Sequence, residues 1–123
     1  MKTIIFTLSV LTSLFLITSC NSTKTNYDLL QGRWVSTDDA KSEIKFEGDK
    51  RFDIYDGESL GGDVFILSNE CTEDSNAKSN PEGQFIVAFS DESIFCYQIV
   101  ILDDKNLELQ FQGRGNTLTY TKK

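Results

Sequence analysis

The chain has 123 residues, of which 12 are Lys or Arg, 19 are Asp or Glu and none is His, giving a formal net charge of −7. This length corresponds to one domain, since domains typically contain roughly 100–150 residues. The acidic charge excludes the basic surface that nucleic-acid binding requires. The lack of His removes imidazole-based acid–base catalysis and His-ligated metal sites.

The first twenty residues have the composition of a targeting segment. Lys2 precedes an apolar run over residues 4–17, which is shorter than the roughly 20 apolar residues of a membrane-crossing helix. The run leads into the sequence LITSC at residues 16–20. This sequence resembles the bacterial lipobox, in which an aliphatic residue and two small residues precede the cysteine that is lipidated. The alternative is an ordinary secretory peptide that ends near a cysteine.

The lipobox resemblance divides the chain into three parts. We expect a lipoprotein signal peptide at 1–19, the lipidated Cys20 with a flexible polar tether at 20–26, and one folded domain at 27–123. Acyl chains such as palmitate on Cys20 would anchor the protein in the bacterial cell envelope, at the outer membrane on its periplasmic or surface side. Each buried CH₂ contributes about 0.8 kcal/mol, so several chains together hold a protein durably.

Two cysteines, Cys71 and Cys96, remain after Cys20 is assigned to lipid. We expect them to form a disulfide, because such bonds form and persist in exported proteins. A bridge that closes a loop of about 25 residues stabilises a fold by about 3.5 kcal/mol in the chain-entropy model. Two reduced, buried thiols are the alternative, whereas a metal or catalytic role lacks the further ligands that it needs.

From residue 27 onward, apolar and polar residues alternate with a period of two, which is typical of antiparallel strands with one buried face. A short helical turn is expected at 27–30, and the Gly61-Gly62 pair and Gly113-x-Gly115 are expected in turns. Strands 63–68 and 93–102 are apolar on both faces, so we expect both of their faces to be covered. The eight predicted strands are 32–37, 43–47, 51–55, 63–68, 83–90, 93–102, 106–112 and 117–121.

Eight short antiparallel strands leave two exposed edges unless the sheet closes on itself. Closure of eight strands gives a small barrel, so the sequence predicts an all-β, eight-stranded antiparallel up-and-down barrel. An open β-sandwich is the alternative.

Three segments resemble lipocalins and the lipocalin-like domains of small bacterial lipoproteins, which have a calycin-type β-barrel. Gly32-Arg33-Trp34 resembles the Gly-x-Trp start of the family, residues 99–109 resemble its penultimate hairpin, and residues 113–123 resemble its Thr- and Tyr-rich last strand. The resemblance implies that Trp34 packs at the closed end of the barrel beneath an Arg, for which Arg114 matches by position. Gly32, Trp34 and Arg114 would then form a structural plug.

An eight-stranded barrel is just wide enough to be filled by side chains or to hold one small ligand. The bulky residues expected to face inward can do either, because they can fill the interior or line an apolar pocket. They are Phe46, Phe52, Ile54, Phe85, Val87, Phe89, Leu107, Leu109 and Phe111.

Two functions follow from these expectations. The first is a membrane-anchored module that binds a small apolar or amphipathic ligand in the barrel. The alternative is a protein-interaction or structural envelope module with a filled barrel, which binds an envelope protein through the acidic loop 69–82 or through outward apolar residues of the fourth and sixth strands. We expect no enzyme, because there is no Gly-x-Ser-x-Gly, no phosphate loop and no metal spacing. No catalytic residue, metal or cofactor is therefore expected.

Overall fold

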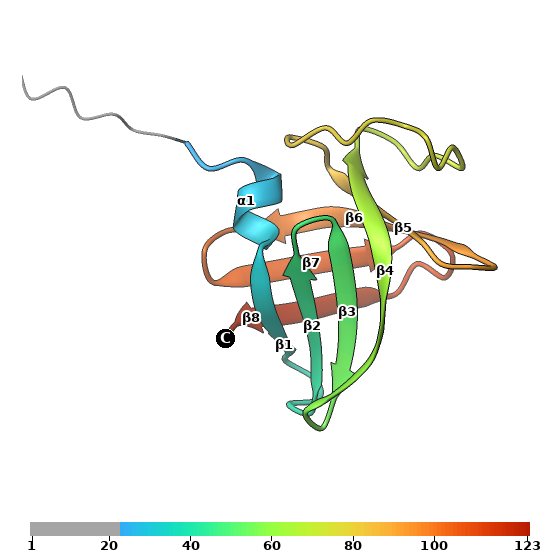
Figure 1. Cartoon of the computed structure of the whole chain (residues 1–123). Helices are drawn as coiled ribbons and strands as arrows, with labels where there is room; N and C mark the ends of the chain where they lie inside the picture. The colour runs from blue at the N-terminus through green and yellow to red at the C-terminus, as the bar shows by residue number, and fades with distance from the viewer. Residues whose placement is uncertain (1–22) are drawn as a thin grey trace, which may run out of the picture.

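A computed structural model gives the arrangement of residues 23–123, which form one short helix and eight β-strands (Figure 1). The expected signal peptide, 1–19, and Cys20 lie outside the described residues. The elements are α1 (Asn26–Leu30), β1 (Gly32–Ser36), β2 (Ser42–Glu47), β3 (Lys50–Tyr55), β4 (Glu58–Ser68), β5 (Phe85–Phe89), β6 (Ile94–Leu102), β7 (Asn106–Phe111) and β8 (Thr117–Lys122).

The eight strands form one closed antiparallel barrel, in which each strand pairs with the next along the chain. The barrel closes where β1 pairs with β8, with Trp34 opposite Lys122 and Ser36 opposite Tyr120. Closure leaves no strand edge of this sheet unpaired, which removes a common route to aggregation. The predicted eight-stranded up-and-down barrel is confirmed, and the open sandwich is excluded.

The Gly61-Gly62 pair lies within β4, so the predicted turn at these residues is wrong. The chain reverses at Asp56 and Gly57 instead, both of which have positive φ angles. Gly62 is needed for a contact, because a Cβ at this position would lie 2.6 Å from a ring carbon of Phe52 on the paired strand. Glycine therefore makes room for an aromatic ring here, as it does in other sheets where an aromatic residue covers a glycine.

The barrel interior is filled mainly by apolar side chains that alternate along the strands. Phe46 and Phe65 meet edge to face near its centre, with ring centroids 5.2 Å apart. The predicted inward positions of Phe46, Leu107, Leu109 and Phe111 are therefore correct. The buried cluster consists of Leu30, Trp34, Ile44, Phe46, Phe65, Leu67, Ile86, Ala88, Tyr97, Leu107, Leu109 and Tyr120.

The predicted inward positions on β5 are wrong. Ile86 and Ala88 belong to the buried cluster, so the alternate residues Phe85, Val87 and Phe89 point outward. The sequence FIVAF has no polar residue to mark the solvent side, which is why alternation could not fix the orientation.

Val87 is nevertheless fully buried on the outer side of the barrel. Its neighbour on β6 is Cys96, which forms a disulfide with Cys71 across 5.9 Å between the Cα atoms. The bond draws the loop between β4 and β5 onto this part of the outer face. The predicted disulfide is confirmed. The expectation that both faces of the fourth and sixth strands are covered is wrong, because Val64 on β4 and Ile94, Val100 and Ile101 on β6 are exposed. The outer face is covered at Val87 on β5 instead.

The predicted inward positions on β3 are also wrong. Phe52 faces outward, where the Lys45 ammonium group lies 4.8 Å from its ring centroid. Ile54 is buried, but it pairs with Glu43, whose carboxylate binds Arg33 on the outer side. The interior positions of β3 belong to Arg51 and Asp53 instead, which lie opposite the core residues Phe46 and Ile44.

Replacing both Cys71 and Cys96 by Ala should lower the free energy of unfolding by about 2–4 kcal/mol, because the unfolded chain is then no longer cross-linked. Thermal unfolding of the purified, oxidised protein, followed by circular dichroism, measures this loss. Equal melting temperatures for the variant and the wild type would contradict the assignment, as would two free thiols in the wild-type protein by mass spectrometry under non-reducing conditions.

Candidate functional site

One end of the barrel is sealed by α1 and Trp34. The indole Nε1 of Trp34 donates a hydrogen bond to the carbonyl oxygen of Leu30 at 2.8 Å, and both side chains are fully buried. The Lys122 ammonium group lies 4.5 Å from a ring centroid of Trp34 and donates to the carbonyl oxygens of Leu29 and Gln31. These carbonyl groups lie at the end of α1, where helical partners are missing.

The expected plug is therefore present at Gly32 and Trp34, but its cation is Lys122 and not Arg114. Arg114 lies in the β7–β8 turn, at the other end of β8, and at about 3.3 Å per residue the two ends of this strand are roughly 20 Å apart. Gly32 has a φ of 112°, and a Cβ there would lie 2.9 Å from the Nζ atom of Lys122. Partial burial lowers the pKa of Lys122, with a smaller contribution from Lys24.

The opposite end of the barrel contains a hollow of about 380 Å³ that is open to solvent. Its wall is formed by side chains from the inner faces of β6, β7 and β8. The ring of Phe111 packs against Tyr97 at 5.2 Å and against Phe95 at 6.3 Å between centroids. The lining residues are Phe95, Tyr97, Phe111, Arg114, Asn116 and Leu118.

A buried ion pair lies beside this hollow. Arg51 is 7% exposed, and its Nη2 atom lies 3.0 Å from an Oδ1 atom of Asp53. The guanidinium carbon lies 4.9 Å from the ring centroid of Tyr97, which also lines the hollow. The Asp53 side chain is 50% exposed, so the pair lies where the interior opens to solvent.

Two features of this pair set it apart from the apolar interior. The Nε atom of Arg51 is buried and has no hydrogen-bond partner among the described residues. Burial raises the pKa of Tyr120. The charge of Arg51 acts in the opposite direction and lowers this pKa, whereas Asp53 and Tyr97 raise it further. These four side chains therefore form one electrostatically linked group in the interior.

The sequence pattern did not single out Arg51 or Asp53 as site residues. Because Phe52 and Ile54 are the apolar residues of β3, the pattern predicted that their face is the buried one, although it is the outer face of the barrel. The signal that could have corrected this lies in the preceding hairpin, where Glu47 pairs with Lys50. With that register, an inward Phe46 requires an inward Arg51.

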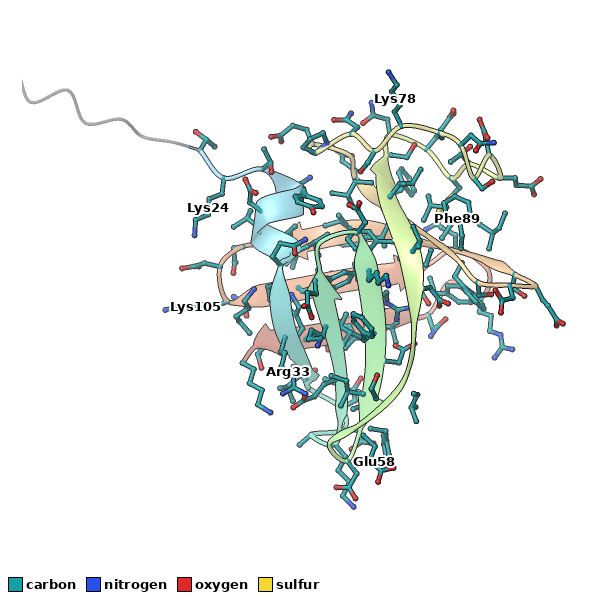
Figure 2. All side chains as sticks on the ribbon, in the orientation of Figure 1. Lys24, Arg33, Glu58, Lys78, Phe89 and Lys105 are labelled. Atoms are coloured by element: carbon teal, nitrogen blue, oxygen red, sulfur yellow. A yellow bond between two sulfur atoms is a disulfide. The ribbon has the colours of Figure 1, made fainter. Side chains whose placement is uncertain are left out.

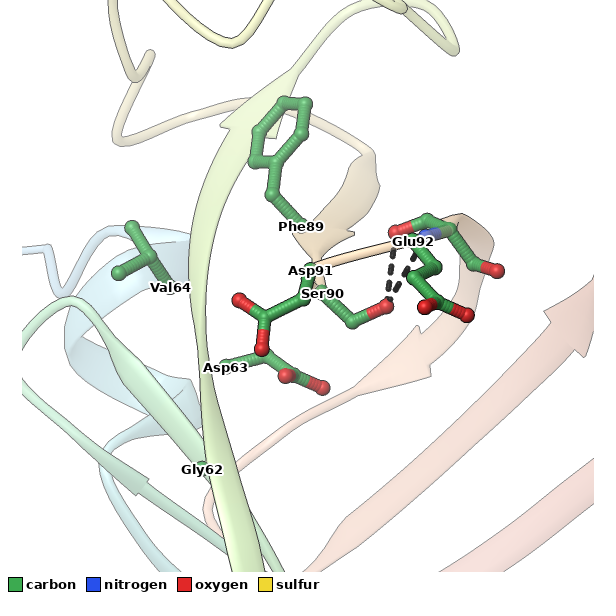
Figure 3. A pocket seen from close by; sticks show the side chains of 8 residues that line it. Gly62, Asp63, Val64, Phe89, Ser90, Asp91 and Glu92 are labelled. Atoms are coloured by element: carbon green, nitrogen blue, oxygen red, sulfur yellow. Dashed lines mark hydrogen bonds between the residues drawn. The ribbon is translucent and has the colours of Figure 1, made fainter.

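A second hollow of about 550 Å³, called the outer hollow below, lies between β4 and the β5–β6 turn (Figure 3). Val64, Phe89 and Ile94 are neighbours across three strands here, and the Val64 and Ile94 side chains are exposed. The hydroxyl of Ser90 bonds to the backbone of Ser93 and fixes the turn. Acidic residues lie around this turn, and none of them forms an ion pair within residues 23–123. They are Glu73, Asp91 and Glu92, together with Asp63, which points to the opposite side of β4 from Val64 (Figure 3).

The residues predicted to line a ligand pocket are found in three places: the hollow at the open end, the outer hollow and the core. Phe111 alone lines the hollow at the open end, Phe89 lines the outer hollow, and Phe46, Leu107 and Leu109 fill the core. Sequence analysis missed Phe95 and Tyr97 as lining residues, because the apolar run of β6 showed no clear alternation. It also missed Leu118, which lies on β8.

Comparison with known proteins finds no matching family model, no similar curated protein and no similar solved structure. Within residues 23–123, no helix has the length and apolar character needed to cross a membrane. The same part of the chain holds no group of three side chains arranged to bind a metal ion. The function has to be inferred from the residues of this chain.

Replacing Lys122 by Met should lower the free energy of unfolding by about 1–3 kcal/mol, because the indole loses its cation and the two carbonyl groups lose their donor. Urea unfolding followed by the fluorescence of Trp34 measures the loss. Lys78→Met is the matched control, since Lys78 is exposed on the β4–β5 loop and points away from the barrel (Figure 2). Equal losses in both variants would contradict a sealing role for Lys122.

Proposed function

We propose that this protein is a lipid-anchored envelope protein whose barrel binds a small amphipathic ligand at its open end. The observation that carries the proposal is the hollow of about 380 Å³, whose aromatic wall belongs to the inner faces of the strands. Binding sites for small molecules are typically concave, of roughly 300–1,000 Å³, and mostly apolar with a few polar groups. The hollow has this composition, with Phe95, Phe111 and Leu118 next to Tyr97 and Arg114.

The difference between the two ends of the barrel supports this proposal. Trp34, Lys122 and α1 seal one end, and the core around Phe46 and Phe65 fills the centre. Among residues 23–123, this arrangement favours entry of a ligand from the end that carries the hollow, and the core around Phe46 and Phe65 keeps it from going deeper. This geometry fits one small molecule, as the width of an eight-stranded barrel requires.

The anchor is a proposal that rests on the sequence LITSC at residues 16–20. Acyl chains on Cys20 would hold the barrel at a membrane of the cell envelope, and the polar residues before α1 would separate it from the lipid. The proposal of ligand binding also draws on the resemblance of Gly32-Arg33-Trp34 to the start of lipocalin-like domains. In that family the Trp lies at the closed end of the barrel, and Trp34 lies at the sealed end here.

Leu118→Trp should abolish binding of a fluorescent amphiphile, because the larger side chain fills the hollow at the open end. Saturable binding to the wild type, measured by fluorescence titration, is the expected reference. Val64→Trp is the matched control, because it adds the same indole to the outer hollow and should bind as the wild type does. A wild-type protein that binds no apolar or amphipathic probe would contradict the proposal.

A second candidate function is binding of an envelope protein through the outer hollow. It is favoured by the apolar row of Val64, Phe89 and Ile94, of which Val64 and Ile94 are exposed, and by carboxylates near it that form no ion pair within residues 23–123. Such a surface suits a partner with apolar and basic residues. Cross-linking in intact envelopes should then capture a partner with the wild type and with Leu118→Trp, but not with Val64→Asp combined with Ile94→Asp. Capture by all three proteins would count against this surface.

A further inference from the structure

We propose that the side of the barrel next to the membrane anchor docks against an anionic lipid surface, which turns the hollow at the open end away from that membrane. The ligand is then exchanged with the aqueous phase and not with the bilayer that holds the anchor. This inference rests on the proposed function, since it needs both the acyl chains on Cys20 and the hollow. It adds which face of the barrel the membrane covers.

The polar tether joins the barrel at its sealed end. Residues 20–25 separate Cys20 from α1, and the plug residues Trp34 and Lys122 bond to carbonyl groups of α1. A segment of this length spans at most about 20 Å. The hollow lies at the start of β8 and the plug at its end, roughly 20 Å apart at about 3.3 Å per residue. The tether can therefore bring the hollow to the bilayer only if it is fully extended along the barrel.

Cationic side chains gather on the side where the tether joins. Figure 2 shows Lys24, Arg33 and Lys105 on the side of α1 and the C-terminus. The backbone N–H of Lys122 donates to the carbonyl oxygen of Lys105, and that of Lys123 donates to Arg33. The charge of Lys24 contributes to lowering the pKa of Lys122. We call the exposed cations of this group the tether-side patch; they are Lys24, Arg33, Lys105 and Lys123.

These cations are only partly neutralised by ion pairs. Arg33 and Lys123 share the single carboxylate of Glu43, at 3.4 and 2.7 Å, so this group keeps an excess positive charge. Lys24 and Lys105 form no ion pair within residues 23–123. Their ammonium groups are therefore available to the phosphate groups of lipids.

Three carboxylates moderate the patch. Asp28 lies at the start of α1. Asp103 and Asp104 lie in the β6–β7 turn together with Lys105, and Asp103 accepts hydrogen bonds from the backbone of that turn. The patch is thus not strongly basic by itself, and its effect comes from the contrast with the other faces of the barrel.

The other faces carry most of the acidic side chains. These side chains lie at the β1–β2 and β3–β4 turns, in the β4–β5 loop and in the β5–β6 turn, where Lys41 and Lys78 are the cations. An anionic lipid surface attracts Lys and Arg and repels carboxylates within a Debye length of about 10 Å. It therefore favours contact with the tether-side patch. The acidic residues are Asp38, Asp39, Asp56, Glu58, Glu70, Glu73, Asp74, Glu82, Asp91 and Glu92.

The test measures which end of β8 lies closer to the bilayer. The acylated protein is reconstituted in vesicles of phosphatidylethanolamine and phosphatidylglycerol that carry a nitroxide quencher on the lipid headgroups. A fluorophore is attached to Thr117→Cys or to Thr121→Cys, which lie on the same outer face of β8, near the hollow and near the patch respectively. Quenching should be severalfold stronger at residue 121 than at residue 117.

A pair of charge variants tests the part played by the patch. Lys24→Glu with Lys105→Glu should bring the ratio of quenching at the two labels down to the value found in phosphatidylcholine vesicles, because the attraction to phosphatidylglycerol is lost. Lys41→Glu with Lys78→Glu is the matched control, since it changes the net charge equally at exposed positions outside the patch, and it should keep the ratio of the wild type. Urea unfolding followed by Trp34 fluorescence shows whether each variant is folded.

Equal quenching at both labels would overturn the inference. Stronger quenching at residue 117 would also overturn it and would place the hollow and Arg114 at the bilayer. Equal loss of the ratio in both charge variants would contradict docking through the patch. These outcomes leave the anchor in place, because they are measured on protein that floats with the vesicles. A wild type that does not float with them, or that floats no better than Cys20→Ala, would instead reject the anchor in the proposed function.

Discussion

The pairing of β1 with β8 is the contact on which the rest of the structure depends. It places Trp34 opposite Lys122, so closure of the sheet and sealing of one end of the barrel occur at the same residues. Both strands contribute to the same buried cluster, because Trp34 and Tyr120 face inward from them. A sheet that failed to close here would expose two strand edges and would leave α1 without the carbonyl contacts that Lys122 makes.

Because one end is sealed, the two ends of the barrel differ in what they can bind. Apolar side chains fill the sealed half and the centre, whereas the open half contains an ion pair and a hollow beneath an aromatic wall. A protein that needed only a stable barrel would gain little from an arginine that is 7% exposed and lacks a partner for one of its donors. This contrast is the main reason to place function at the open end.

The sequence predicted the fold well, because eight short strand segments separated by turn residues have few arrangements other than a closed sheet. It also located the disulfide, since only two cysteines remained after Cys20. It predicted the site poorly. β5 has no polar residue to mark its outer face, and β3 places two charged residues, Arg51 and Asp53, inside the barrel. Which face of such a strand points into the barrel depends on the hairpin register and on the loop that covers the outer side. The alternation of apolar and polar residues gives no information on either.

The measurement that tests the central claim most directly is an NMR titration of the labelled wild-type protein with decanoate. The account predicts that signals of Phe95, Tyr97, Phe111 and Leu118 shift together on saturation, while the indole N–H of Trp34 at the sealed end remains unchanged. Shifts confined to Val64, Phe89 and Ile94 on the outer face, or a shifted Trp34 indole without changes at the open end, would contradict it.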